Sequence, residues 1–268
     1  NVAVGVTAGV HIHGNYSTHI GYQAGRHASG SNNTSLGFMA GYGSITSAPY
    51  STGTDNTSVG YKALTNFTAG TANVALGYQA LSELRTGTYS VGIGVHAGDH
   101  ATGSYNTFVG GKAGMGGTTS APYSSGPNNT AIGYTAMANF TTAEDNTAVG
   151  MQTGLSLTSG HSNTLLGNAA GRYMTTTSNT VLIGLLAGDA INSTGADGTV
   201  AIGRSAGAAI TSGAGNLAIG YEAMKVHTTG VRNIAIGYGA MNDTDAGSTS
   251  LTSTNNIFIG YDAGGGTW

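Results

Sequence analysis

Eight of the 268 residues are histidines, the side chain most often used as a metal ligand in proteins. His11 and His13 lie two residues apart, on one face of an extended strand, and His96 lies four residues before His100. A metal site also needs convergent ligands with supporting partners, yet the chain has no cysteine and no cluster of acidic residues beside these histidines. We therefore expect structural or solvent-exposed histidines and predict no metal or cofactor site, unless three copies of one histidine meet on a symmetry axis.

Paired carboxylates can hydrolyse a glycosidic bond, but the chain holds only eleven scattered acidic residues. Asp55, the Glu144–Asp145 pair and the Asp243–Asp245 pair stand among turn-forming residues, where solvated surface is expected. No Gly-x-Ser-x-Gly motif is followed by suitable Asp and His partners for nucleophilic catalysis. The sequence predicts a non-enzyme without catalytic residues, with a polysaccharide-degrading tailspike as the catalytic alternative.

Aromatic side chains are the better candidates for binding a ligand. Tyr50 and Tyr123 follow a proline in two long loops, and Phe67 and Phe140 lie in or just after the same segments. Aromatic faces at these positions can stack on sugar rings while Asn and Thr donate hydrogen bonds. The alternative, equally open, is that each Pro-Tyr pair packs its own loop down. Seven tyrosines at another, regularly recurring position are expected to pack along a ladder or between subunits: Tyr22, Tyr61, Tyr78, Tyr134, Tyr221, Tyr238 and Tyr261.

A tandem repeat must position all of these residues. Fifteen glycines, each preceded by Val, Ile or Leu, recur at spacings of 16 or 17 residues, with one spacing of 19 and three of 23. An alanine follows three residues later in fourteen of the fifteen units, and an asparagine usually stands four residues before. We call these residues the anchor glycines: Gly5, Gly21, Gly37, Gly60, Gly77, Gly94, Gly110, Gly133, Gly150, Gly167, Gly184, Gly203, Gly220, Gly237 and Gly260.

Each unit is predicted to form one coil of two short strands and two turns. Alternation along residues 146–150 places Thr147 and Val149 on one side and Ala148 on the other, so we expect an inner aliphatic row. The threonines would share that inner row, which argues against an ice-binding surface. The Tyr-x-Ala segment at 134–136 is predicted as the second strand, with its alanine in a narrow interior. Stacked coils would then align identical residues into ladders, such as asparagine on asparagine.

Longer units interrupt this regularity. Residues 43–68 recur at 116–141, a displacement of 73 residues, and the enlarged loops are predicted near 43–56, 116–129 and 242–256. The sequence therefore predicts an all-β fold, a parallel β-solenoid of about fifteen two-strand coils in a single repeat domain, 1–268. So thin a roll buries little apolar surface by itself, so we expect it to bury one face against identical chains.

The units at 73–81, 128–137 and 233–241, such as Asn-Ile-Ala-Ile-Gly-Tyr-Gly-Ala-Met, resemble the repeats of trimeric autotransporter adhesin heads. They are still more similar to repeats of bacteriophage tail fibres, and the resemblance covers the whole chain. It implies a left-handed β-roll assembled as a homotrimer, a piece of a longer fibre chain. It also implies a virion tail fibre that attaches to a host cell-surface glycan or protein. The alternatives are an adhesin head on a bacterial surface and a purely structural spacer.

Charge and hydropathy limit the partners. The 8 basic and 11 acidic residues give a formal net charge of −3, so no basic surface for nucleic acid is expected. No run of about 18 apolar residues appears, so we expect no membrane insertion. Glycine supplies 47 residues, and 39% of residues are hydrophobic, a combination that favours an ordered, turn-rich repeat over disorder.

Overall fold

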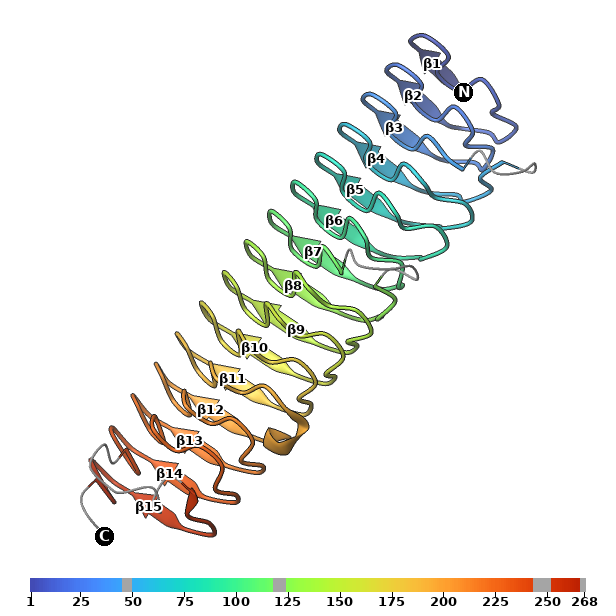
Figure 1. Ribbon diagram of the computed structural model, residues 1–268. Helices are drawn as coiled ribbons and strands as arrows, with labels where there is room; N and C mark the ends of the chain where they lie inside the picture. The colour runs from blue at the N-terminus through green and yellow to red at the C-terminus, as the bar shows by residue number, and fades with distance from the viewer. Residues whose placement is uncertain (45–49, 118–123, 243–251, 266–268) are drawn as a thin grey trace. The chain divides into compact units, whose positions relative to one another are not determined.

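The computed structural model describes residues 1–44, 50–117, 124–242 and 252–265. The chain divides into two compact units, Asn1–Thr141 (unit 1) and Thr142–Trp268 (unit 2). In the described part of each unit, successive coils each contribute one three-residue strand (Figure 1). The strands of unit 1 are β1 (Val2–Val4), β2 (Thr18–Ile20), β3 (Thr34–Leu36), β4 (Thr57–Val59), β5 (Val74–Leu76), β6 (Val91–Ile93), β7 (Thr107–Val109) and β8 (Thr130–Ile132).

Unit 2 is built in the same way. A short 3-10 turn, η1 (Thr194–Ala196), occupies the coil with the 19-residue spacing. The strands of unit 2 are β9 (Thr147–Val149), β10 (Thr164–Leu166), β11 (Val181–Ile183), β12 (Val200–Ile202), β13 (Leu217–Ile219), β14 (Ile234–Ile236) and β15 (Ile257–Ile259).

Neighbouring strands within a unit pair in parallel at identical repeat positions. Ser35 of β3 pairs with Ser58 of β4, and Ala201 of β12 pairs with Ala218 of β13. Each strand ends directly before an anchor glycine. The predicted all-β parallel solenoid is therefore confirmed.

The anchor glycines are needed for their backbone conformation and for the close approach of the coils. All fifteen have φ between 129° and 138°, a region that side chains of L-residues rarely enter. A Cβ atom added to Gly37 would lie 2.6 Å from the carbonyl oxygen of Gly60 in the next coil. The predicted asparagine ladder is also present: Asn73 donates to the Oδ1 of Asn56 at 3.1 Å and to the carbonyl of Gly87 at 2.9 Å.

The predicted second strand is wrong, because the described residues form one strand per coil and a tight turn follows it. In the segment 134–136, Thr135 has φ of 54°, which ends the extended conformation. Its backbone N–H still donates to the carbonyl of Gly111 in the preceding coil at 2.9 Å. The turn is thus hydrogen-bonded from coil to coil like a strand, without being one.

The predicted direction of the strand side chains is also wrong. The middle residue points into the coil: Ala148 and Leu165 are fully buried. The flanking aliphatic residue faces outward, as Leu166 shows with 45% of its surface exposed. Thr147 is exposed as well, so the argument that buried threonines exclude an ice-binding surface is wrong. Threonine nevertheless occupies the first strand residue in at most three consecutive coils of a unit before an aliphatic residue replaces it, so the threonines form no long continuous row.

The interior explains this orientation, because the space beside the middle strand residue is limited. Where the middle strand residue is large, as in Phe108 and Leu182, the fourth residue after the anchor is glycine. A Cβ added to Gly188 would approach Leu182 Cδ1 to 2.8 Å. In five coils with a small middle residue, such as Ala75, the fourth position carries a large residue such as the buried Leu81. In the coils that carry a large residue at either position, the middle residue and the fourth residue after the anchor share one part of the interior.

Candidate functional site: an exposed apolar face and a cavity

Two rows of apolar side chains in unit 1 are exposed or half-buried. The aliphatic row consists of the residues just before the anchor glycines: Val4, Ile20, Leu36, Val59, Leu76, Ile93, Val109 and Ile132. The aromatic row consists of ring residues just after the anchor: Tyr22, Phe38, Tyr61, Tyr78 and Tyr134. Only the anchor glycine separates the two rows along the chain, so they run next to each other, and we call them together the apolar face of unit 1.

Rings of the aromatic row stack on one another. The Tyr22–Phe38, Phe38–Tyr61 and Tyr61–Tyr78 pairs have centroids 5.0–5.2 Å apart and planes within 11° of parallel. In unit 2 the same position stacks Tyr238 between Tyr221 and Tyr261. The expected packing along a ladder is therefore confirmed for these residues. Because the ring faces cover each other, they are closed to stacking with a sugar ring.

The loop aromatics predicted to bind a ligand lie in different environments. Phe67 and Phe140 are buried in the core, so their rings are not available to a surface ligand. Their position follows from the narrow turn, which directs these side chains inward. Tyr50 is half-buried and packs on His11, with ring centroids 4.5 Å apart. Tyr123 lies outside the described residues, as do 45–49, 118–123 and 243–251 of the three enlarged loops.

The histidines mostly contact other rings or acidic groups. His27 stacks on His11 at 5.0 Å, and burial, helped by the charges of His11 and Arg26, lowers the pKa of His27. His96 Nδ1 lies 2.8 Å from Asp99 Oδ2. Within the described ranges, no three His, Asp or Glu side chains converge in a way that would hold a metal ion.

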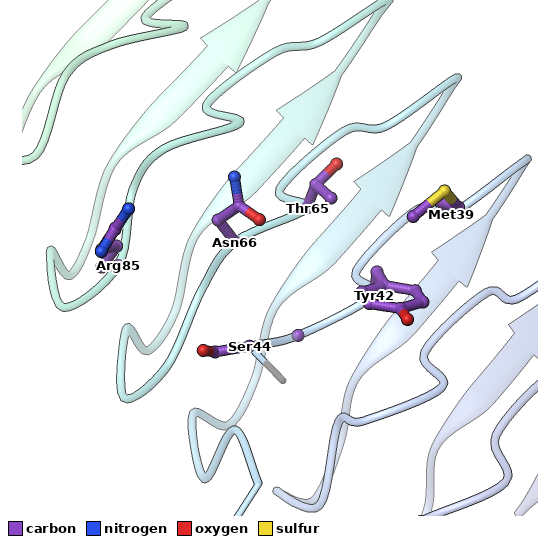
Figure 2. Close-up of a pocket in the computed structure, with 7 residues that line it drawn as sticks. Met39, Tyr42, Ser44, Thr65, Asn66 and Arg85 are labelled. Atoms are coloured by element: carbon purple, nitrogen blue, oxygen red, sulfur yellow. The ribbon is translucent and has the colours of Figure 1, made fainter. Parts of the chain in front are cut away.

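A cavity of about 350 Å³ opens beside the first enlarged loop. Its lining comes from three consecutive coils: Met39, Tyr42, Gly43, Ser44, Thr65, Asn66 and Arg85. Figure 2 shows Met39 and Tyr42 on one side and Asn66 and Arg85 on the other. These residues were not predicted from the sequence. The available signal was glycine at position 43, six residues after its anchor, where the neighbouring coils carry His27 and Asn66.

Polar groups on the Asn66 side are held by Glu83. Asn66 Nδ2 donates to Glu83 Oε1 at 2.7 Å, and Arg85 Nη2 lies 3.4 Å from Glu83 Oε2. On the opposite side, the ring of His27 meets Tyr42 nearly edge-on, with centroids 5.0 Å apart. The cavity is thus bounded by an apolar wall and a polar wall, each fixed by a neighbour outside it.

Comparisons with protein-family models, with curated proteins and with solved structures find no match for this chain. Across the described residues, no helix has the length and apolar character needed to span a membrane.

Proposed function

We propose that the chain is a non-catalytic segment of a homotrimeric fibre that attaches to a host cell surface, as in a phage tail fibre. The aliphatic row carries this proposal. The residue before the anchor is Val, Ile or Leu in all fifteen coils, although it points outward. The inward-pointing residue beside it varies among Ala, Ser, Gly, His, Leu and Phe. An outward position that tolerates less variation than the core is restricted by something that covers it.

The apolar face is large enough to matter. Its five aromatic residues expose 40–56% of their surface. At roughly 200 Å² per aromatic side chain, these rings leave about 450 Å² of surface in water. This area alone falls within the range of about 300–600 Å² for the largest patch of a typical monomer. The aliphatic row adds to it, so a lone chain would expose an unusually large apolar surface.

A second copy of the chain is the occupant that best matches this face. The side chains repeat once per coil, at the spacing of about 4.8 Å between neighbouring strands. A partner with the same repeat presents side chains at the same interval, so the side chains of one chain can fit between those of the other along the whole interface. Neither row contains a charged residue, which removes the repulsion that identical chains would otherwise meet. Three copies around one axis would close the interface and leave the opposite surface for a receptor.

A structural spacer is the second candidate. The stacked faces of the aromatic row and the buried Phe67 and Phe140 favour it, because they remove several aromatic residues from contact with a receptor. An adhesin head on a bacterial surface would share the assembly and differ in its origin.

The mass of the full chain in solution, measured by light scattering during size-exclusion chromatography, tests the assembly. We expect three times the 26.5 kDa of one chain. Replacing both Leu36 and Leu76 with threonine keeps the β preference of the strand while removing apolar surface, so we expect a smaller assembly. The control is Tyr16→Asn, an exposed residue with φ of 59°, which asparagine accepts. A folded wild-type chain that remains monomeric at tens of micromolar would overturn the proposal.

A further inference from the structure

The cavity beside the first enlarged loop has the size and composition of a small-molecule site. Its volume of about 350 Å³ lies at the lower end of the range of about 300–1,000 Å³ for ligand pockets. Thr65 is buried, while Tyr42 and Asn66 are half-buried and Arg85 is exposed at the rim. Such a gradient from buried to exposed groups admits a small ligand from solvent.

A glycine on the cavity lining interrupts a row of larger side chains. The sixth residue after the anchor is His27 in one coil, Gly43 in the next and Asn66 in the one after. The backbone stays in register across the gap, because the Gly43 N–H donates to the carbonyl of Thr65 at 2.9 Å. A Cβ at Gly43 would lie 2.6 Å from Ser51 Oγ, and φ of 83° also disfavours any other residue. Glycine is therefore required at position 43 of the coil stack.

The two walls suit a ligand with one apolar and one polar side. Met39 and the Tyr42 ring offer an apolar wall, and Asn66 and Arg85 offer hydrogen-bonding groups opposite it (Figure 2). Glu83 engages the Asn66 amide nitrogen and one Arg85 nitrogen. Asn66 Oδ1 and the other guanidinium N–H groups have no partner among the residues that the structure describes, so they are available to accept and donate hydrogen bonds. A pyranose ring has this character, with C–H groups on its face and hydroxyls at its edge.

We propose that this cavity binds one pyranose unit of a cell-surface polysaccharide. The inference rests on the proposed attachment function and names its ligand class and its site. Tyr42 would pack against the C–H face of the sugar, and Asn66 and Arg85 would bind its hydroxyls. Arg85 would also pair with a carboxylate if the sugar carries one.

The second enlarged loop supplies an internal comparison. At the displacement of 73 residues, Tyr42 corresponds to Met115, Thr65 to Ala138 and Arg85 to Thr158, while Asn66 corresponds to Asn139. The second copy therefore lacks the Tyr42 ring, the Thr65 hydroxyl and the Arg85 guanidinium, and it carries Lys112 in place of Met39. The proposed sugar site therefore belongs to the first loop and not to the second.

Saturation-transfer NMR on the full chain tests the site, with methyl glucoside and glucuronic acid as neutral and acidic probes. We expect transfer to at least one probe. The variants Tyr42→Met and Asn66→Ala should each weaken binding about tenfold, which corresponds to about 1.4 kcal/mol. The matched control Asn139→Ala, at the corresponding position of the second loop, should bind as the wild type does. Loss of glucuronic acid binding alone in Arg85→Thr would support pairing of the guanidinium with a carboxylate.

Two outcomes would overturn the site. One is the absence of transfer to both probes at millimolar concentration, and the other is transfer that survives both Tyr42→Met and Asn66→Ala. If either result were obtained with a chain of trimeric mass, the proposed trimeric fibre would remain, with a role as a spacer. Binding that depends on Tyr42 in a monomeric chain would instead preserve the sugar site and remove the proposed assembly.

Discussion

His19 should make unit 1 sensitive to acid, because its imidazole is buried without hydrogen-bond partners. It occupies the inward position of β2, between Ala3 of β1 and Ser35 of β3. Its side chain is fully buried, and neither ring nitrogen has a partner among the described residues. Burial lowers the pKa of His19 from 6.5 to about 4, because the charged form would lose its hydration.

The sign and size of the effect follow from this pKa. Since the folded pKa lies below the unfolded one, the unfolded chain binds more protons between pH 6.5 and 4, and stability falls as the pH falls through that window. The loss of unfolding free energy is about 2 kcal/mol at pH 5 and approaches about 3 kcal/mol below pH 4. At pH 7.5 the histidine is neutral in both states and the term vanishes.

The variant His19→Leu isolates this contribution. Leucine already occupies the same inward position in β10 and β11, as Leu165 and Leu182, so the coil accepts its shape. Urea unfolding followed by circular dichroism should show the variant gaining about 2 kcal/mol on the wild type between pH 7.5 and pH 5. The control His13→Leu changes an exposed histidine and should show no such gain. Parallel pH profiles for the wild type and His19→Leu would refute the argument.

Two further predictions concern the packing and the ladder. Phe108→Ala should lower the free energy of unfolding by about 3–5 kcal/mol, and Gly114→Leu should lower it as well. The double variant should recover most of this loss, because it recreates the pairing of a small middle residue with a large fourth residue. Additive losses of stability in thermal unfolding would contradict this. Asn73→Ala should lower the free energy of unfolding by about 2–5 kcal/mol, because it leaves the Ser90 N–H and the Gly87 carbonyl without their partner. Hydrogen exchange of the Ser90 amide should become faster. An unchanged exchange rate would show that the asparagine ladder does not protect this amide.

The positions of the strands and ladders were predictable because the same structural requirement selects the same residue types at equivalent positions of the fifteen coils. Gly77 must leave room for the next coil, and Ala80 must fit a narrow interior. Asn73 must bond to the coils before and after it. Each requirement admits few residue types, so these positions stand out from the variable ones without any structure.

The orientation of the strands was not predicted correctly, because a three-residue strand offers too little alternation. In Val74–Leu76 two aliphatic residues flank one alanine, and hydrophobicity alone places the aliphatic pair inside. The interior instead accepts Ala75 together with the large Leu81. The informative signal was that a large middle residue is always accompanied by glycine at the fourth position after the anchor, as Phe108 is by Gly114, which shows that the two positions share one space.

The cavity was not predicted from residue types, because its lining comes from three different coils. Gly43 is one of 47 glycines, and nothing in its immediate sequence distinguishes it from a turn glycine. Tyr42 and Arg85 come from different coils, 43 residues apart in sequence, and meet only through the coil register. Their convergence on one cavity is what the structure adds.

The contrast between two positions of the coil indicates that one serves assembly of the chains and the other serves ligand recognition. The residue before the anchor is uniformly aliphatic, whereas the sixth residue after it changes from coil to coil: His11, His27, Gly43, Asn66, Glu83, His100 and Gly116. A uniform exposed row suits contact with an identical chain, and a variable row suits recognition of a ligand with its own pattern. Leu76→Thr should then lower the assembly mass without changing sugar binding per folded chain, and Asn66→Ala should do the reverse. If either variant changed both properties equally, assembly and recognition would share one surface, and the separation of the apolar face from the cavity would be wrong.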